Sequence, residues 1–169
     1  QSYETLKGIT LKVNVKPLAL ISSDVSSVAD QVYTASRITP AVTVTHAGKQ
    51  LVKDTDYSIS YGENIETTGG SITVTGKGNY SGSITVKFGI YKISVASDAV
   101  SRKISDTGYS GAVQHQKPQL TYNGNTLTEG KDYTLTYPDS GCINEGTYRV
   151  TAVGTGLYTG SVTLAYKIN

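Results

Sequence analysis

The sequence predicts an all-β protein built as a tandem repeat, and three observations support this. Apolar and polar residues alternate with period two at 83–90 and 161–168, as in half-buried strands. No stretch of ten or more residues shows a convincing 3.6-residue apolar period. Ser, Thr, Val, Ile and Tyr are frequent, and charged residues make up 17% of the chain, below the roughly 25% of an average globular protein. This composition suits pleated, half-buried strands.

A glycine-rich turn occurs twice. Residues 76–82 read Gly-Lys-Gly-Asn-Tyr-Ser-Gly, and residues 154–160 read Gly-Thr-Gly-Leu-Tyr-Thr-Gly. A phosphate-binding Walker loop needs Gly-x-x-x-x-Gly-Lys followed by Ser or Thr, and it opens a helix whose amides hold the anion. Neither copy has that spacing, and an alternating strand pattern follows each. We therefore interpret both segments as hairpin turns.

The two turns belong to a repeat that covers most of the chain. Residues 56–61 read Asp-Tyr-Ser-Ile-Ser-Tyr and recur 76 positions further on as Asp-Tyr-Thr-Leu-Thr-Tyr. The glycine turns are 78 positions apart, so two residues have been inserted around 138–144. We expect this insertion to lie in a loop, where added length costs little.

The repeat predicts the domain organisation. Residues 17–92 form the first repeat and residues 93–169 the second. The alternating segment at 9–15 matches the last strand of each repeat, so we interpret residues 1–16 as the terminal strand or remnant of a preceding repeat. The chain is therefore expected to be cut from a longer array.

Each repeat contains about five short strand segments separated by turn residues. In the first repeat we expect strands at 41–45, 57–61, 71–75 and 83–90, with a weaker one at 30–35. Short strands at this spacing predict two tandem small antiparallel β-sandwich domains that are immunoglobulin-like in outline.

Charge and composition argue against several classes of protein. The formal net charge is +2, and Lys and Arg are scattered in runs of at most two, so we expect no nucleic-acid partner. No apolar segment approaches the roughly 18 residues that cross a bilayer, so we expect no membrane insertion. A single Cys excludes an intrachain disulfide, and the lack of Met and Trp suits an exported bacterial protein.

The repeated pattern resembles a known group of domains. It consists of Leu-x-x-x-x-Asp-Tyr-x-x-x-Tyr, then Gly-x-Gly-x-Tyr-x-Gly, then an alternating strand. This pattern, present at 28–91 and 104–168, is similar to the tandem immunoglobulin-like repeats of large surface and secreted proteins of Gram-positive, often gut, bacteria. The resemblance implies an extracellular or cell-surface location and a role as a stalk, a spacer or a companion of adhesins and polysaccharide-degrading enzymes.

Most residues with reactive side chains are better explained by structure than by chemistry. His46 and His115 do not match each other between the repeats, so we interpret both as surface residues. Cys142 is expected to be a loop thiol, with an intermolecular link as the alternative. Asp56 and Asp132 occupy equivalent positions before a tyrosine, which favours a turn-holding role over a glycosidase pair. Lys87, on an outward strand position, is a poor partner for an isopeptide crosslink.

The tyrosines of the glycine turns, Tyr80 and Tyr158, are the predicted ligand-binding residues. One interpretation is that each ring folds over the end of the sheet and its hydroxyl bonds to the backbone. The other is that each ring is exposed and stacks on a sugar. We favour the structural interpretation, because sugar-binding platforms usually use broader surfaces and the chain lacks Trp.

The sequence thus predicts a non-catalytic pair of immunoglobulin-like modules that acts as a stalk, spacer or adhesion unit. The alternative is a carbohydrate-binding accessory module. We expect no catalytic residues, no metal site and no cofactor. The expected partners are neighbouring repeats of a larger polypeptide, with host or plant glycans or surface proteins as further partners.

Overall fold

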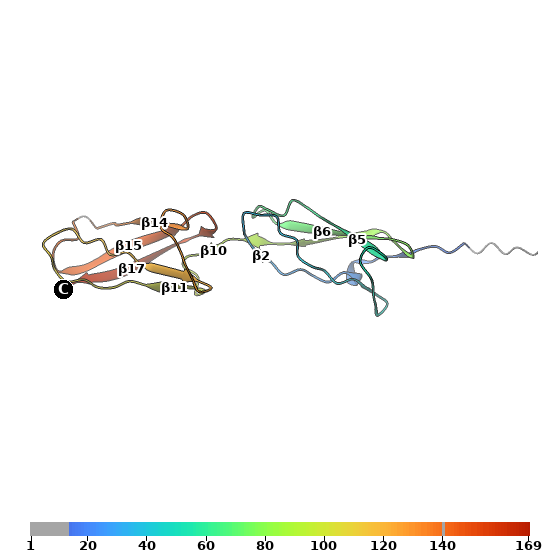
Figure 1. Ribbon diagram of the computed structural model, residues 1–169, viewed down its shortest axis with the longest axis horizontal. Coiled ribbons are helices and arrows are strands. Elements are labelled where there is room, and N and C mark those ends of the chain that lie inside the picture. Colours follow the sequence, from blue (N-terminus) through green and yellow to red (C-terminus); the bar gives the residue numbers. More distant parts are fainter. Residues whose placement is uncertain (1–13, 140) are drawn as a thin grey trace, which may run out of the picture. The chain divides into compact units, whose positions relative to one another are not determined.

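The computed structural model describes residues 14–139 and 141–169 (Figure 1). The predicted remnant strand at 9–15 therefore lies largely outside the described residues. The described chain forms two compact units. The first unit comprises 14–28, 40–62 and 71–87, and the second comprises 29–39, 63–70, 88–139 and 141–169. The boundaries inferred from the repeat, after residues 16 and 92, stay predictions.

The described residues are strands and connecting segments, which confirms the all-β prediction. The single helical element among them is a 3-10 turn, η1 (Ser22–Asp24). The strands as far as residue 91 are β1 (Leu18–Ala19), β2 (Gln31–Val32), β3 (Thr45–His46), β4 (Lys49–Gln50), β5 (Tyr57–Tyr61), β6 (Gly70–Gly76), β7 (Tyr80–Ser81), β8 (Ser83–Phe88) and β9 (Ile90–Tyr91). They are followed by β10 (Ile93–Ser94), β11 (Val100–Lys103), β12 (Gln119–Tyr122), β13 (Asn125–Thr126), β14 (Tyr133–Thr136), β15 (Gly146–Gly154), β16 (Tyr158–Thr159) and β17 (Ser161–Ile168).

Two three-stranded sheets hold equivalent positions in the two repeats. In the first, β6 lies between β5 and β8, and it pairs antiparallel with β5 from Tyr57↔Gly76 to Tyr61↔Ile72. In the second, β15 lies between β14 and β17 and pairs antiparallel with both. A third sheet, β11-β12-β13, belongs to the second repeat. In β6, β8, β15 and β17 the alternating residues place one side of the strand inward.

The inward residues form separate hydrophobic cores. In the first unit the core consists of Leu20, Val25, Val44, Leu51, Tyr57, Val74 and Tyr80. In the second unit one cluster consists of Val95, Val100, Leu120, Leu127, Tyr133 and Ala152, and another of Cys142, Tyr166 and Ile168. The outward face carries hydroxyl groups: those of Thr73 and Thr85 lie 3.0 Å apart, and those of Thr151 and Thr163 lie 2.8 Å apart. Burial on one face only explains the period-two pattern of the sequence.

Short parallel pairs join an early segment of each repeat to the segment at its end. β2 runs parallel to β9, and the amide of Gln31 donates to the Gly89 carbonyl at 2.9 Å. At the equivalent place, Thr107 bridges to Ile168 in parallel and donates to the Lys167 carbonyl at 2.9 Å. The prediction of antiparallel pairing therefore describes the three-stranded sheets but not these terminal segments.

Some predicted strands are shorter than expected, for local reasons. The strands predicted at 57–61 and 161–168 are present over those residues as β5 and β17. In the segment 41–45 only Thr45 lies in a named strand; Val44 makes an isolated antiparallel bridge to Val25, and the amide of Thr43 donates to the Ser26 side chain at 3.0 Å. The segment 83–90 breaks at Gly89, whose amide donates to the Asp30 carboxylate at 2.7 Å. The weaker strand predicted at 30–35 is reduced to Gln31–Val32.

Candidate functional site

The glycine turns are closed by their own backbone. The amide of Gly76 donates to the Gly82 carbonyl at 2.9 Å, and that of Gly154 donates to Gly160 at 2.8 Å. A Cβ atom at Gly76 would lie 2.6 Å from the Ser81 amide nitrogen, so the strands approach too closely for any other residue. Because these amides already donate to carbonyl groups, the turns are poorly suited to hold a phosphate. The turn interpretation is confirmed.

The tyrosines of these turns pack inward to different degrees. Tyr80 belongs to the core of the first unit with 8% of its surface exposed, and its ring meets the His46 ring edge-on at 5.7 Å. Tyr158 is half-buried and meets the Tyr122 ring edge-on at 6.1 Å. Burial raises the pKa of Tyr158. Little ring face is left at Tyr80 to stack on a ligand, and the binding role of both residues stays a prediction.

Other tyrosines make the hydroxyl-to-backbone bond that the sequence analysis assigned to the turn tyrosines. The Tyr61 hydroxyl donates to the Pro40 carbonyl at 3.2 Å, and the Tyr137 hydroxyl donates to the Gln116 carbonyl at 3.1 Å. These two bonds are 76 positions apart along the chain, as the repeat requires. Tyr61 and Tyr137 thus fix the segment that precedes the β3–β4 hairpin and its counterpart.

The repeated aspartates, Asp56 and Asp132, accept hydrogen bonds from backbone amides, as predicted. The carboxylate of Asp56 accepts the Val52 amide at 2.9 Å, and that of Asp132 accepts the Thr128 amide at 2.8 Å. Such a short-range carboxylate-to-amide bond stabilises a turn. These carboxylates therefore have a structural role in each repeat.

His46 is paired with a buried carboxylate, which corrects its assignment as a surface residue. Its Nδ1 atom lies 2.9 Å from Asp24 Oδ2, and the same oxygen accepts the Ile21 amide at 2.8 Å. The hydrogen bond from His46, followed by that from Ile21, lowers the pKa of Asp24. The pair ties η1 to β3. Sequence reasoning missed it because Tyr122 replaces His46 in the second repeat, and only this difference marked the position.

The other reactive residues lie in the second unit. His115 is exposed and stacks on the Tyr137 ring at 4.0 Å, in line with its assignment as a surface residue. Cys142 has 1% of its surface exposed, and its thiol donates to the Asp139 carbonyl at 3.4 Å. The thiol is therefore part of a core, where a second chain does not reach it without opening the loop.

A polar hollow lies at the loop inserted in the second repeat. It has a volume of about 340 Å³ and is lined by Tyr109, Asn144 and Glu145. Tyr109 has 56% of its surface exposed, compared with 46% for Tyr91. Sequence reasoning did not select these residues, although the unmatched insertion at 138–144 marked the region.

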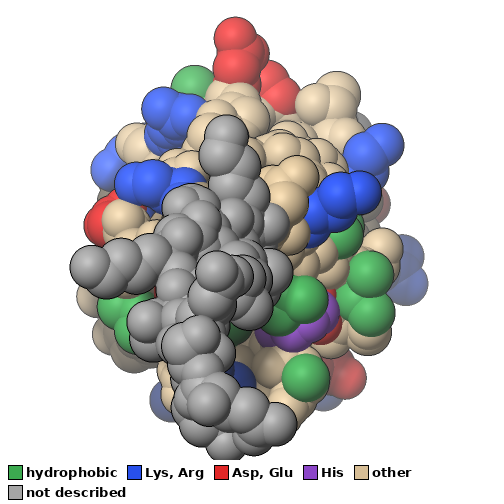
Figure 2. Space-filling view, turned by 90° about the vertical axis from the view of Figure 1, so that its right-hand side faces the viewer, with side chains coloured by type: hydrophobic (Ala, Val, Ile, Leu, Met, Phe, Trp, Pro, Cys, Tyr) green, Lys and Arg blue, Asp and Glu red, His purple; other side chains and the backbone are tan. Residues whose placement is uncertain are grey.

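Charged groups elsewhere are dispersed. On the face shown in Figure 2, Lys and Arg side chains lie among acidic, hydrophobic and uncharged polar surface. Within residues 14–139 and 141–169, no three His, Cys, Asp or Glu side chains come together as metal ligands.

None of the helical segments in the described chain has the length and apolar character needed to cross a membrane.

Comparison of the chain with protein-family models gives no match, and comparison with curated proteins gives none either.

Proposed function

We propose that the chain is a non-catalytic pair of immunoglobulin-like modules from a bacterial cell-surface or secreted protein, and that it serves as a stalk or spacer within a larger array. The observation that carries this proposal is that three pairs of polar side chains at equivalent positions of the two repeats bind backbone. Asp30, Asp56 and Tyr61 have counterparts at Asp106, Asp132 and Tyr137, and all six bind a backbone amide or carbonyl. Polar groups used in this way hold a fold together.

The pairing of the terminal segments supports a mechanical role. In the first repeat β2 pairs in parallel with β9, which lies at the end of that repeat. When a repeat is pulled at its two ends, an early strand and the last strand that run parallel are pulled in opposite directions along their length, so their hydrogen bonds carry the load together. The Thr107–Ile168 pairing provides the same geometry in the second repeat. Each repeat is thus built to resist extension.

The partners in this proposal are neighbouring repeats of the same polypeptide. Each repeat has its own buried residues, so it does not need its neighbour to form a core. The resemblance in sequence supports an extracellular location. An adhesion role would add a ligand to the same scaffold.

Pulling a single molecule by its two ends tests the proposal. We expect two separate unfolding events, each releasing roughly 250 Å of chain, because a repeat of 76 residues extends by about 3.4 Å per residue. A single cooperative event, or extension without resistance, would contradict a pair of load-bearing modules. Hydrolysis of a polysaccharide by the purified chain would contradict the non-catalytic part.

A carbohydrate-binding accessory module remains the alternative from the sequence, but its predicted residues gain little support. Tyr80 contributes its ring to the core, and Tyr158 is half-buried. A glycan array probed with the intact chain and with Tyr158→Ala tests it. Selective binding that is lost in a folded Tyr158→Ala variant would favour the alternative over the stalk.

A further inference from the structure

The last strand of the second repeat, β17, has one side that faces away from its neighbour β15. β17 is an end strand of its three-stranded sheet. Near its end, the amide of Lys167 donates to the Asp106 carboxylate at 2.8 Å, so the backbone groups of Lys167 point away from β15. Backbone groups alternate in direction from one residue of a strand to the next. Those of Ser161, Thr163 and Ala165 therefore also point away from β15.

A side-chain contact supports this direction. In an antiparallel pair, two opposite residues whose backbone groups point away from each other have side chains that lie close together. Thr163 pairs with Thr151 of β15, and their two hydroxyl oxygens lie 2.8 Å apart. Across residues 14–139 and 141–169, no other strand and no backbone hydrogen bond covers Ser161, Thr163 and Ala165 on this side. We call these three residues the open edge of β17.

The protein's own chain closes the open edge at both ends. Before it, the amide of Val95 donates to the Thr159 carbonyl at 2.8 Å. After it, the amide of Thr107 donates to the Lys167 carbonyl at 2.9 Å. Residues 161–165 lie between these contacts, which at about 3.4 Å per residue is roughly 17 Å of extended chain. The place beside the open edge is therefore long enough for a short strand only.

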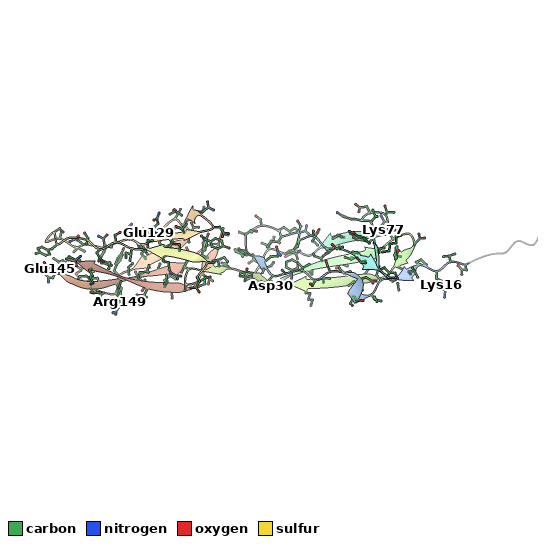
Figure 3. The ribbon with its side chains drawn as sticks, turned by 90° about the horizontal axis from the view of Figure 1, so that it is seen from below. Lys16, Asp30, Lys77, Glu129, Glu145 and Arg149 are labelled. Atoms are coloured by element: carbon green, nitrogen blue, oxygen red, sulfur yellow. The ribbon has the colours of Figure 1, made fainter. Side chains whose placement is uncertain are left out.

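The open edge has a polar outer face and an apolar inner face. Its own three side chains are exposed, whereas the intervening Val162 and Leu164 are half-buried and pack against the core of the second unit. A strand added here would place alternate side chains beside Val162 and Leu164, where apolar groups are removed from water. Figure 3 labels Arg149 on β15, which pairs with Ala165 at the end of the open edge.

The first repeat differs at one end of the equivalent edge. At the displacement of 78, the open edge corresponds to Ser83, Thr85 and Lys87. Natural sheets use Lys on an end strand to prevent pairing with another chain. The side chain of Lys87 is exposed, so the first repeat has this protection. Ala165 leaves the second repeat without it.

From these relationships we propose that the open edge of β17 binds a short extended peptide of alternating apolar and polar residues. The peptide adds a strand to the sheet, its backbone bonds to the free backbone groups, and its apolar side chains pack beside Val162 and Leu164. A second copy of this chain does not fit. Its own β17 carries the segments at Val95 and Thr107 on the same side, and these occupy the space that the ends of the other β17 need. The proposal goes beyond the stalk function and does not depend on it.

The test is amide hydrogen exchange of the 15N-labelled full chain, followed by two-dimensional NMR, with the peptide acetyl-Thr-Val-Thr-Val-Thr-amide as the probe. This sequence reads the same in both directions, so it can place Val against the inner face whichever way it runs. Acetyl-Val-Val-Thr-Thr-Thr-amide is the control of equal composition, because it lacks the alternation. A second control carries a methyl group on every peptide nitrogen of the probe, which removes its backbone donors.

The exchange pattern of the free chain tests the open edge itself. We expect fast exchange at Ser161, Thr163 and Ala165, and slow exchange at Val162 and Leu164, whose amides point toward β15. The probe should bind with a Kd on the order of 1 mM. At three times the Kd it should slow exchange at the first three amides about fourfold, because a bound amide exchanges only after the peptide has left. Neither control peptide should slow it.

Two reciprocal substitutions test the edge lysine. Ala165→Lys gives the second repeat the edge of the first, and it should weaken binding of the probe about threefold or more. Lys87→Ala should create binding in the first repeat, seen as slower exchange at Ser83 and Thr85. Thr136→Lys is the matched control, because it adds the same charge on β14 at the other end of the sheet, and it should leave binding unchanged.

Several results would overturn the proposal. Slow exchange at the open edge without any peptide would show that it is already covered. Equal slowing by either control peptide would show that strand addition is not the mode of binding. Sedimentation that detects a dimer broken by Ala165→Lys would assign the edge to a second copy. Probe binding of wild-type strength in folded Ala165→Lys would remove the role of the lysine. Failure of peptide binding leaves the two unfolding events under force unaffected, so the two proposals fail separately.

Discussion

The carboxylate of Asp106 accepts a hydrogen bond from the backbone amide of Lys167 at 2.8 Å, across 61 residues of sequence. Asp30 makes the equivalent bond to Gly89 at 2.7 Å in the first repeat. Each bond lies beside the parallel pairing that joins the start of a repeat to its end. These two carboxylates are therefore central to the proposed resistance of the repeats to extension.

Replacing Asp106 should destabilise the second repeat. Asp106→Ala removes a charge-assisted hydrogen bond, and we expect a loss of about 1 kcal/mol in the free energy of unfolding, since the bond is exposed to solvent. Urea denaturation followed by circular dichroism measures the change. Asp98→Ala is the control, because Asp98 is exposed and its ion pair with Arg102 spans 4.0 Å. If the two substitutions lowered the free energy of unfolding equally, Asp106 would have no special role in stability.

The glycines at the start of the turns should be irreplaceable. At Gly154 a Cβ atom would lie 2.5 Å from the Thr159 carbonyl oxygen, so Gly154→Ala should cost about 2 kcal/mol or more. Gly108→Ala is the matched control, because no atom lies within 4 Å of the place that its Cβ would take, and it should change stability by less than about 1 kcal/mol. Thermal denaturation of both variants checks this. If Gly154→Ala left the stability unchanged, the turn would have room for a Cβ atom, and the close approach would not constrain it.

The stability of the protein should fall at alkaline pH. Burial raises the pKa values of Tyr57, Tyr133, Tyr137, Tyr158 and Tyr166 above the ordinary value of 10.0. A raised pKa in the folded state contributes stability that is present below pH 10 and is lost as the pH rises through the folded value. Urea midpoints at about pH 8 and about pH 11 should therefore differ, with the lower midpoint at the higher pH.

A conservative variant separates the tyrosine effect from other alkaline titrations. Tyr166 is buried, and its hydroxyl donates to the Gln114 carbonyl at 2.9 Å. Tyr166→Phe should lower stability at neutral pH by about 1 kcal/mol and reduce the alkaline loss. An alkaline loss of the same size in wild type and in Tyr166→Phe would mean that this phenol does not contribute to it.

The His46–Asp24 pair should make the stability of the protein depend on pH in the acid range. The hydrogen bonds from His46 and Ile21 hold the pKa of Asp24 below its ordinary value of 3.8. The resulting stability is present above that pH and is lost as the pH falls through the lower folded value. His46→Leu should raise the pKa of the Asp24 carboxyl, as followed by carbon NMR, whereas His115→Leu should not. No change in His46→Leu would assign the shift to the Ile21 amide alone.

The local features could be predicted from the sequence because they depend on neighbouring residues. Alternation at Tyr57–Tyr61 and Ser161–Ile168 is explained by one buried face, and the repeated glycines mark turns whose backbone excludes a Cβ. The structure also shows why two interpretations differed from the outcome. The partner of the Tyr61 hydroxyl, Pro40, lies 21 residues away. The partner of His46 lies 22 residues away and has no copy in the second repeat, so comparison of the repeats did not reveal it.

The hollow at Tyr109 could not be predicted from the sequence, because it also depends on contacts between residues far apart in the chain. The insertion at 138–144 was expected to be a loop, but its anchoring depends on Cys142 being buried beside Tyr166. A single cysteine in a polar segment gives no sign of such burial. The residues that line the hollow come together only through that folded loop.

The measurement that tests the mechanical account most directly is the unfolding force of the chain when it is pulled at a constant rate by its two ends. Wild type should show two force peaks, and the double variant Asp30→Ala/Asp106→Ala should lower both, because each carboxylate lies beside the parallel pairing that carries the load. Asp98→Ala should leave both forces unchanged. If the double variant unfolds at the wild-type forces although its equilibrium stability is reduced, the parallel terminal pairing does not bear the load.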